Sequence, residues 1–157
     1  MKFTAKLPLV SVLALLMIPV LFFTGCGKNE GVPDQSKITI DPVSVSLQNI
    51  VGDTIQNYNV IVRYADGTPI PYAKIHISGA FAMPASAAMY QFYYYPDGTQ
   101  NPAGNATVDS GFDAQTDKFG VYTFSIVVFG PGSAFKDTLN ITSGTTSGSS
   151  TLSLTVT

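Results

Sequence analysis

The residues that could carry out catalysis or bind a metal are few, because the 157-residue chain has one cysteine, Cys26, and one histidine, His76. A lone cysteine cannot form an internal disulfide, and a metal site needs several ligands close together. His76 lies on the polar side of the alternating segment 73–78, with no carboxylate or second histidine nearby in sequence. A solvent-facing histidine is predicted. With no base beside a nucleophile, we expect a protein that is not an enzyme and needs no cofactor.

Three aspartates recur at intervals of four residues: Asp109, Asp113 and Asp117. Residues an even number apart share one face of a strand, so the three carboxylates would line up and could offer oxygen ligands to calcium. The spacing does not match an EF-hand loop, and solvent-facing acidic side chains are the simpler interpretation. No metal site is predicted, and these aspartates are the candidate calcium ligands should one exist.

Residues 90–95 (YQFYYY) form the most aromatic segment of the chain. In a strand, alternate side chains would point to opposite faces, so one set could join the core while the other contacts solvent. Tyrosine is favoured at recognition surfaces for its flat apolar ring and polar tip. The candidate contacts with a partner or a glycan are Tyr90, Tyr93 and Tyr95. The alternative is structural, with both faces covered by the neighbouring sheet and residues 82–88.

The N-terminus is apolar without interruption by charge over residues 7–23, and it follows Lys2 and Lys6. A short basic region, an apolar stretch and small residues at its exit are typical of a secretory signal. A membrane-spanning helix is the alternative, but it needs about 20 apolar residues. Pro8 and Pro19 also disfavour a long straight helix. Residues 1–25 are therefore predicted to be a signal peptide.

The tetrapeptide Phe23-Thr24-Gly25-Cys26 resembles the lipobox of bacterial lipoproteins, in which an apolar residue, a small residue and Gly or Ala precede an invariant cysteine. The resemblance implies that Cys26 receives a diacylglyceryl group and becomes the first residue of the mature chain. It also implies an envelope location. Gly27 is not the aspartate that favours retention in the inner membrane, so the outer membrane is expected.

Two or three acyl chains would hold the protein on a membrane without spanning it. Each buried CH₂ contributes about 0.8 kcal/mol, and a single chain binds only marginally. The residues after Cys26 are polar and contain Gly and Pro, which is typical of a flexible linker. We predict a signal peptide at 1–25, a lipidated cysteine and tether at 26–36, and a folded domain at 37–157.

Charge excludes one class of partner. Without residues 1–25, six basic and ten acidic residues remain, a net charge of −4, and the basic residues form no cluster in the sequence. Nucleic-acid binding depends on neutralising phosphates with Lys and Arg. We therefore expect no nucleic-acid partner.

From Lys37 onward the apolar residues recur every second position, which predicts strands rather than helices. The alternation holds over 37–47 apart from Pro42, and again over 58–64, 73–78 and 121–126. Asp66-Gly67 predicts a tight turn, and segments 136–143 and 150–157 read as a final hairpin around residues 144–148. The sequence predicts an all-β, immunoglobulin-like antiparallel β-sandwich of about seven to eight strands.

The order of three motifs, DGTPIPYAKIHISG (66–79), TDKFGVYTFSIVV (116–128) and the closing Ser/Gly-rich hairpin, resembles the bacterial Ig-like domains of the invasin/intimin group. The matching positions are turns and core contacts, so the resemblance implies architecture and carries over no catalytic residue. Large adhesins carry such domains in tandem, and this chain has one. We expect a membrane-anchored envelope lipoprotein whose domain serves structure, adhesion or protein docking, with an envelope protein as partner. The alternative function is a carbohydrate-binding module that uses the segment 90–95.

Overall fold

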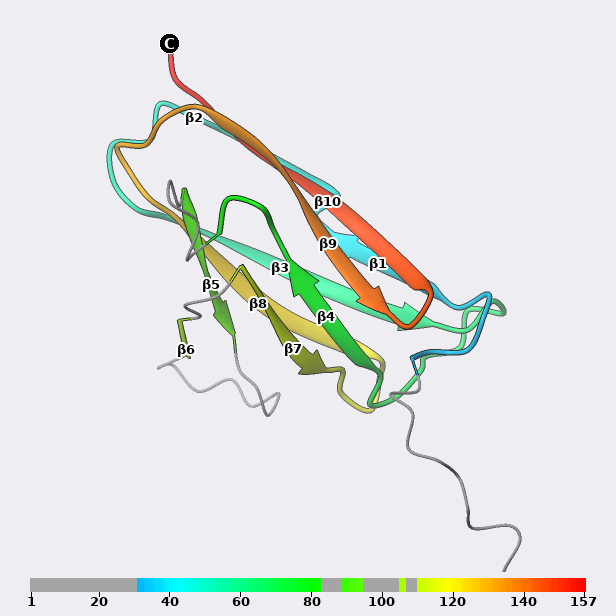
Figure 1. Ribbon diagram of the computed structural model, residues 1–157. Helices are drawn as coiled ribbons and strands as arrows, with labels where there is room; N and C mark the ends of the chain where they lie inside the picture. Colours follow the sequence, from blue (N-terminus) through cyan, green and yellow to red (C-terminus); the bar gives the residue numbers. More distant parts are fainter. Residues whose placement is uncertain (1–30, 83–88, 95–104, 107–109) are drawn as a thin grey trace, which may run out of the picture.

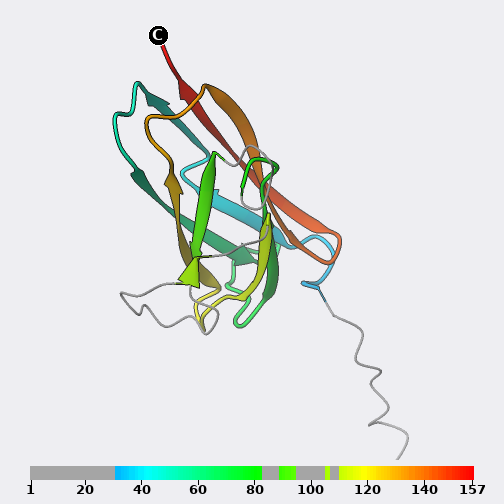
Figure 2. The same ribbon diagram turned by 60° about the vertical axis from the view of Figure 1, so that its left-hand side comes forward.

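The structure, a computed structural model, describes residues 31–82, 89–94, 105–106 and 110–157. Within these residues there are ten strands and no helix, arranged as two facing sheets (Figure 1, and turned in Figure 2). The strands are β1 (Lys37–Asp41), β2 (Ser44–Gln48), β3 (Thr54–Arg63), β4 (Lys74–Ser78), β5 (Tyr90–Tyr94), β6 (Asn105–Ala106), β7 (Gly111–Gln115), β8 (Val121–Val128), β9 (Phe135–Ser143) and β10 (Thr146–Thr155).

The strand order identifies the type of sandwich. One sheet has the order β1-β3-β8-β5-β6 and the other β2-β10-β9-β4-β7. Strands β1, β3, β8 and β5 follow the A-B-E-D order of an immunoglobulin-type sandwich, and β10, β9 and β4 follow its G-F-C order. The predicted immunoglobulin-like β-sandwich is confirmed. Two details were wrong: the described residues hold ten strands, not seven or eight, and β2 pairs with β10 in parallel.

The parallel pair arises where the chain changes sheets. β1 ends at Asp41, and after Pro42 the chain crosses to the other sheet, where β2 runs beside β10. Proline has no N–H to donate to a ladder, so a strand cannot continue through it in the interior of a sheet. The interruption of the alternation at Pro42 therefore marks the change of sheet, and β1 and β2 are edge strands of different sheets.

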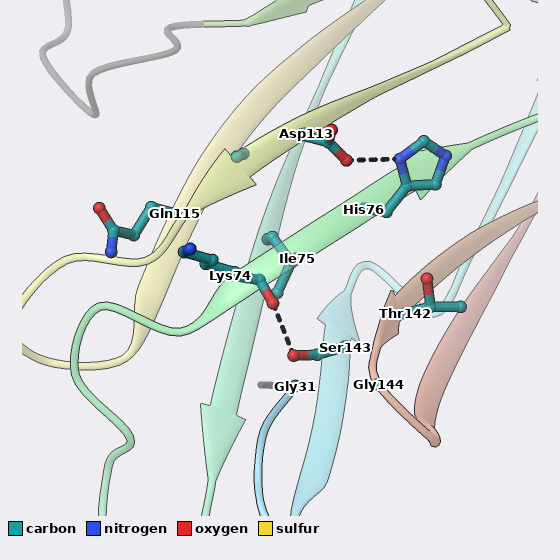
Figure 3. Close-up of a pocket in the computed structure, with 10 residues that line it drawn as sticks. Gly31, Lys74, Ile75, His76, Asp113, Gln115, Thr142, Ser143 and Gly144 are labelled. Carbon is teal, nitrogen blue, oxygen red and sulfur yellow. Dashed lines mark hydrogen bonds and ion pairs between the residues drawn. The ribbon is translucent and has the colours of Figure 1, made fainter. Parts of the chain in front are cut away.

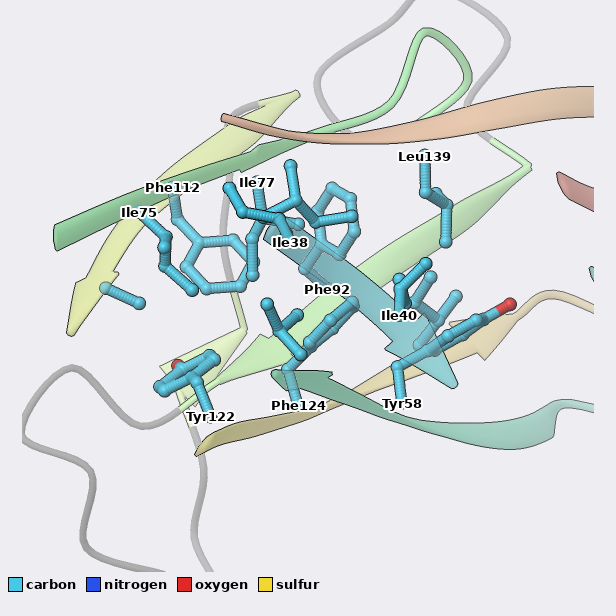
Figure 4. Close-up of a cluster of buried hydrophobic side chains, with 14 of the residues drawn as sticks. Ile38, Ile40, Tyr58, Ile75, Ile77, Phe92, Phe112, Tyr122, Phe124 and Leu139 are labelled. Carbon is cyan, nitrogen blue, oxygen red and sulfur yellow. The ribbon is translucent and has the colours of Figure 1, made fainter. Parts of the chain in front are cut away.

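Alternation of apolar and polar residues produces the core between the sheets. Along β8, Tyr122, Phe124 and Ile126 are buried while their neighbours are partly exposed, as predicted. Phe124 lies within a cluster of aromatic rings (Figure 4). Its ring centroid is 5.3 Å from that of Tyr58 and 5.9 Å from that of Phe92, which belong to β3 and β5. Aromatic pairs of this kind contribute about 0.5–1.5 kcal/mol beyond the area they bury.

Among the described residues, one acidic side chain lies inside this core. Asp137 of β9 is buried, and its Oδ2 accepts hydrogen bonds from the Tyr90 hydroxyl at 2.7 Å and from the Phe81 N–H at 2.9 Å. Tyr90 belongs to β5 of the facing sheet, so the carboxylate joins the two sheets across the core. Burial, followed by the adjacent Asp137 carboxylate, raises the pKa of the Tyr90 hydroxyl well above its usual value.

The predicted Asp66-Gly67 turn is confirmed. Asp66 Oδ1 accepts hydrogen bonds from the Thr68 N–H at 2.9 Å and from its hydroxyl at 2.7 Å, and Gly67 has φ +88°. The Thr68 backbone N–H is the main reason that the pKa of the Asp66 carboxyl is lowered, and the Thr68 hydroxyl adds to it.

A second turn joins β7 to β8. Asp117 Oδ1 accepts hydrogen bonds from the backbone N–H groups of Phe119 at 2.8 Å and Val121 at 2.9 Å. Gly120 has φ +71°, and a Cβ atom there would lie 2.5 Å from the Val62 carbonyl oxygen. Only glycine fits this close approach of two backbones.

The predicted final hairpin is formed by β9 and β10, with a shorter turn than expected. Thr146 pairs with Ser143 and Gly148 pairs with Ile141, so only Gly144 and Thr145 connect the strands. Gly144 supplies the positive φ of +60° that a two-residue hairpin turn requires.

The sandwich has two distinct ends. We call the end where the described chain begins the entry end. It comprises residues 31–36 and the turns at 64–73, 116–120 and 144–145. The opposite, exit end comprises the connections at 49–53 and 129–134 and the C-terminal residues 156–157 (Figure 1). No helix within the described ranges is long and apolar enough to cross a membrane.

Candidate functional site

A pocket of about 490 Å³ lies on the outer side of β4, β7 and β9 (Figure 3). It is the best candidate for a binding site because it combines a histidine, a carboxylate, an amine and hydroxyl groups. Its lining residues are Gly31, Lys74, Ile75, His76, Asp113, Ala114, Gln115, Thr142, Ser143 and Gly144.

His76 and Asp113 form the most polar pair of the pocket. They lie directly opposite each other in the β4–β7 ladder, and 2.8 Å separates His76 Nδ1 from Asp113 Oδ1. The side chains are 49% and 90% exposed. The prediction that His76 faces solvent is confirmed. No carboxylate lies near His76 in sequence, but pairing of β4 with β7 brings Asp113, 37 positions away, next to it.

The pair alone does not provide nucleophilic catalysis. A histidine oriented by a carboxylate can act as a base only if a hydroxyl or thiol lies on its other side. Among the described residues, Asp113 is the side-chain partner of the imidazole, and Thr142, the β9 partner of His76 in the ladder, makes no hydrogen bond to the ring. The pocket therefore offers hydrogen-bonding groups for recognition of a polar ligand. A solvent-exposed polar pair of this kind contributes little to stability.

The N-terminal segment forms one rim of the pocket. The Val32 N–H donates to the Ser143 hydroxyl at 3.1 Å, and this hydroxyl donates to the Lys74 carbonyl. Val32 is buried, and a Cβ atom on Gly31 would lie 2.3 Å from Gly144 Cα, so the backbones touch. The sequence assigned residues 26–36 to a flexible tether, and the structure places 31–36 of that range against the sandwich.

The structure does not bring together the two candidate calcium ligands that it describes, Asp113 and Asp117. Asp113 is paired with His76, and Asp117 caps the β7–β8 turn through the Phe119 and Val121 N–H groups. Asp109 lies outside the described residues. In the described part of the chain, no group of three or more metal-ligating side chains occurs.

The three candidate tyrosines lie in three different situations. Tyr90 is fully buried and donates its hydroxyl to Asp137, so its assignment as a partner contact was wrong. Tyr93 is partly exposed on the outer face of its sheet, where β5 places it opposite Ser125 of β8. Tyr95, like Cys26, lies outside the described residues.

A polar row beside Tyr93 is a feature that sequence reasoning missed. The Ser125 hydroxyl donates to Asn57 Oδ1 at 2.7 Å, and the Thr123 hydroxyl donates to Asn59 Oδ1 at 2.8 Å. These side chains alternate with the buried positions of β3 and β8 and face solvent. Asparagine is depleted in strands, so two asparagines at alternating positions of a strand were a signal that could have been used.

No protein-family model matches the chain, and no curated protein matches it. Among solved structures, the chain is similar to a conjugative transposon lipoprotein from Bacteroides eggerthii, with 6% identity and a TM-score of 0.46, over 78% of this chain and 98% of that one. It is also similar to a family 123 glycoside hydrolase from Clostridium perfringens, with 8% identity and a TM-score of 0.46, over 78% of this chain and 27% of that one. A third likeness is to the Calx CBD1 domain, with 9% identity and a TM-score of 0.35, over 79% and 99% of the two chains. At these identities and TM-scores, the likenesses carry no argument about function.

Proposed function

We propose that this chain is a lipid-anchored binding module of a bacterial cell envelope, held on the outer membrane through Cys26 and presenting one immunoglobulin-like sandwich to a protein partner. The observation that carries the proposal is the packing of residues 31–36 on the sandwich. Val32 is buried and Asp34 Oδ1 accepts a hydrogen bond from the Thr145 hydroxyl at 3.0 Å. The folded unit therefore begins only five residues after Cys26.

A folded unit so close to the anchor favours local docking over long-range adhesion. The Cα atoms of Cys26 and Gly31 can be at most about 18 Å apart, since an extended chain spans roughly 3.3–3.6 Å per residue. The exit end then points away from the membrane. It exposes the aliphatic side chains of Val51 and Val156, and Ile55 is exposed at the adjacent start of β3; such side chains suit contact with another protein.

Cys26→Ala is expected to abolish incorporation of labelled palmitate and to release the protein from the membrane fraction, because the thiol is the only attachment point for the diacylglyceryl group. Ser44→Ala, at an exposed position of β2, is the matched control and should leave labelling unchanged. Palmitate incorporation that survives in Cys26→Ala would contradict the proposed anchoring.

A second candidate function is glycan binding, favoured by the position of Tyr93 beside the row formed by Asn57 and Ser125. A ring flanked by amide and hydroxyl groups can stack on a sugar and hydrogen-bond its hydroxyls. If this candidate is right, binding on a glycan array is lost in Tyr93→Ala and kept in Tyr72→Ala, which removes an exposed tyrosine elsewhere. An array without any signal for the wild type would leave the protein partner as the ligand.

A further inference from the structure

The exposed aromatic side chains gather at one end of the sandwich. Among the described residues, the aromatic side chains that are exposed are Tyr64, Tyr72 and Phe119, and all three belong to the turns of the entry end. Tyr72 is 60% exposed and Phe119 59% exposed. Large aromatic rings exposed to water at the tips of turns, away from the core, indicate a surface that contacts a membrane or another protein.

The backbone holds two of these rings in neighbouring turns. The Tyr72 N–H donates to the Asp117 carbonyl at 3.1 Å, and the Phe119 N–H donates to the Asp117 carboxylate at 2.8 Å. Lys118 directly precedes Phe119 in sequence, and its Nζ lies 4.9 Å from the centroid of the Phe119 ring. The result is a preformed tip that combines aromatic rings with a cation.

The charge of the entry end differs from that of the chain. Four of the five basic residues in the described ranges lie in the segments that define this end or directly beside them: Lys37, Arg63, Lys74 and Lys118. The carboxylates in the segments that define this end are Asp34, Asp66 and Asp117, and each accepts hydrogen bonds from its own turn or the adjacent one. The described basic residues are therefore concentrated at this end, where they offset its carboxylates, although the net charge of the protein is negative. Anionic lipid headgroups attract such residues.

The entry end is also the end from which the chain leads to Cys26. Gly31 touches Gly144 of the β9–β10 turn, and four residues separate Gly31 from the anchoring cysteine. An extended chain of this length spans at most about 18 Å, so a lipid on Cys26 keeps the entry end near the bilayer. Tyrosine rings and the stems of lysine side chains are favoured at the boundary between headgroups and acyl chains.

We propose that the entry end, with Tyr64, Tyr72 and Phe119 at its tips and Lys118 beside them, contacts the headgroup layer of the membrane that carries the lipid on Cys26. This inference rests on the proposed lipid anchor. It adds that the sandwich is oriented, because the aromatic tips and the anchor together fix which end faces the bilayer. The exit end and the outer faces of both sheets are then left free for the partner.

The chain contains no tryptophan, so a single one can report on each end. The test uses full-length, lipidated Phe119→Trp in vesicles of phosphatidylethanolamine and phosphatidylglycerol, part of which carry bromine on acyl carbons close to the headgroup. We expect the emission of Trp at position 119 to shift to shorter wavelength and to be lost on bromination. Tyr72→Trp, in the neighbouring turn, is expected to behave in the same way. Val51→Trp, which replaces a 93% exposed side chain at the exit end, is the matched control and should keep its emission.

The outcomes separate the orientation from the anchor. Co-flotation of both variants with vesicles, together with unchanged emission at positions 119 and 72, would overturn the inference and leave the anchored module standing. Equal quenching at positions 119 and 51 would also overturn it, because the sandwich would then have no preferred orientation. Failure of every variant to float with vesicles would overturn the anchor itself and the inference with it.

Discussion

Asp137→Ala is expected to lower the free energy of unfolding by about 3 kcal/mol, because it leaves the Tyr90 hydroxyl and the Phe81 N–H without an acceptor. Hydrogen bonds to a charged group contribute about 1.5–3 kcal/mol each, and a buried donor left unpaired costs about 1–3 kcal/mol. The loss is smaller than the sum of these terms, since removing a buried carboxylate also removes its desolvation penalty. Urea unfolding monitored by circular dichroism measures the change.

The matched control is Asp41→Ala, which removes an exposed carboxylate from β1 and should change stability by less than about 0.5 kcal/mol. Tyr90→Phe, alone and combined with Asp137→Ala, completes a double-mutant cycle. The two changes should be strongly non-additive, because both remove the same 2.7 Å hydrogen bond between the sheets. Additive effects, or a loss below about 1 kcal/mol for Asp137→Ala, would contradict the role of this carboxylate as the polar link across the core.

The alternation of apolar and polar residues in the sequence already indicated that Asp137 is buried. In β9 the residues Phe135, Leu139 and Ile141 share the buried phase, and Asp137 is in phase with them. An acidic residue in the apolar phase of a strand must find donors inside the protein. Which donors it finds depends on how two sheets face each other, and alternation along a single strand carries no information about that.

The fold class, the turns and the inward-facing residues followed from local rules, whereas contacts between strands did not. The alternation of β8 and the Asp66-Gly67 turn depend on neighbouring residues, so the sequence predicts them directly. The approach of His76 to Asp113 depends on the pairing and register of β4 and β7. A shift by one residue would have placed the two side chains on opposite faces, so the pair could not be found from spacing.

The candidate contact residues Tyr90 and Tyr93 also show that local rules predict the face of a strand but not what covers that face. Alternation placed Tyr90 and Tyr93 on opposite faces of a strand, but it could not tell which face was covered, and the burial of Tyr90 removes it from the candidate surface. The entry end could not be assembled from sequence either. Its tips come from turns separated by some fifty positions, and they meet because Tyr72 and Phe119 both hydrogen-bond to Asp117. The lipid on Cys26 stays a prediction.

Alkaline pH is expected to destabilise the sandwich through its buried tyrosines. Burial raises the pKa of the Tyr58 hydroxyl from 10.0 to about 12, and the nearby Ser150 hydroxyl opposes this only in part. A raised pKa in the folded state means that the native protein holds the proton more tightly than the unfolded chain. The stabilisation is complete below pH 10 and is lost as the pH rises through 12. Tyr58 alone accounts for a loss of about 2 kcal/mol by pH 12, and Tyr90 adds to it in the same direction.

Tyr58→Phe separates this contribution from the rest. The Ser150 hydroxyl donates to the Pro42 carbonyl, and among the described residues the Tyr58 hydroxyl has no hydrogen-bond partner. The variant keeps the ring stacked on Phe124 and removes an unpaired buried group, so we expect it to be about 1 kcal/mol more stable at pH 7. Its loss of stability between pH 10 and 12 should be shallower than that of the wild type, whereas Tyr72→Phe, at an exposed position, should follow the wild-type curve. Urea midpoints measured from pH 8 to 12 would reveal both effects. Parallel curves for Tyr58→Phe and the wild type would mean that the Tyr58 hydroxyl reaches water in the folded state, and that the interior beside Phe124 is less tightly closed than the packing of its rings indicates.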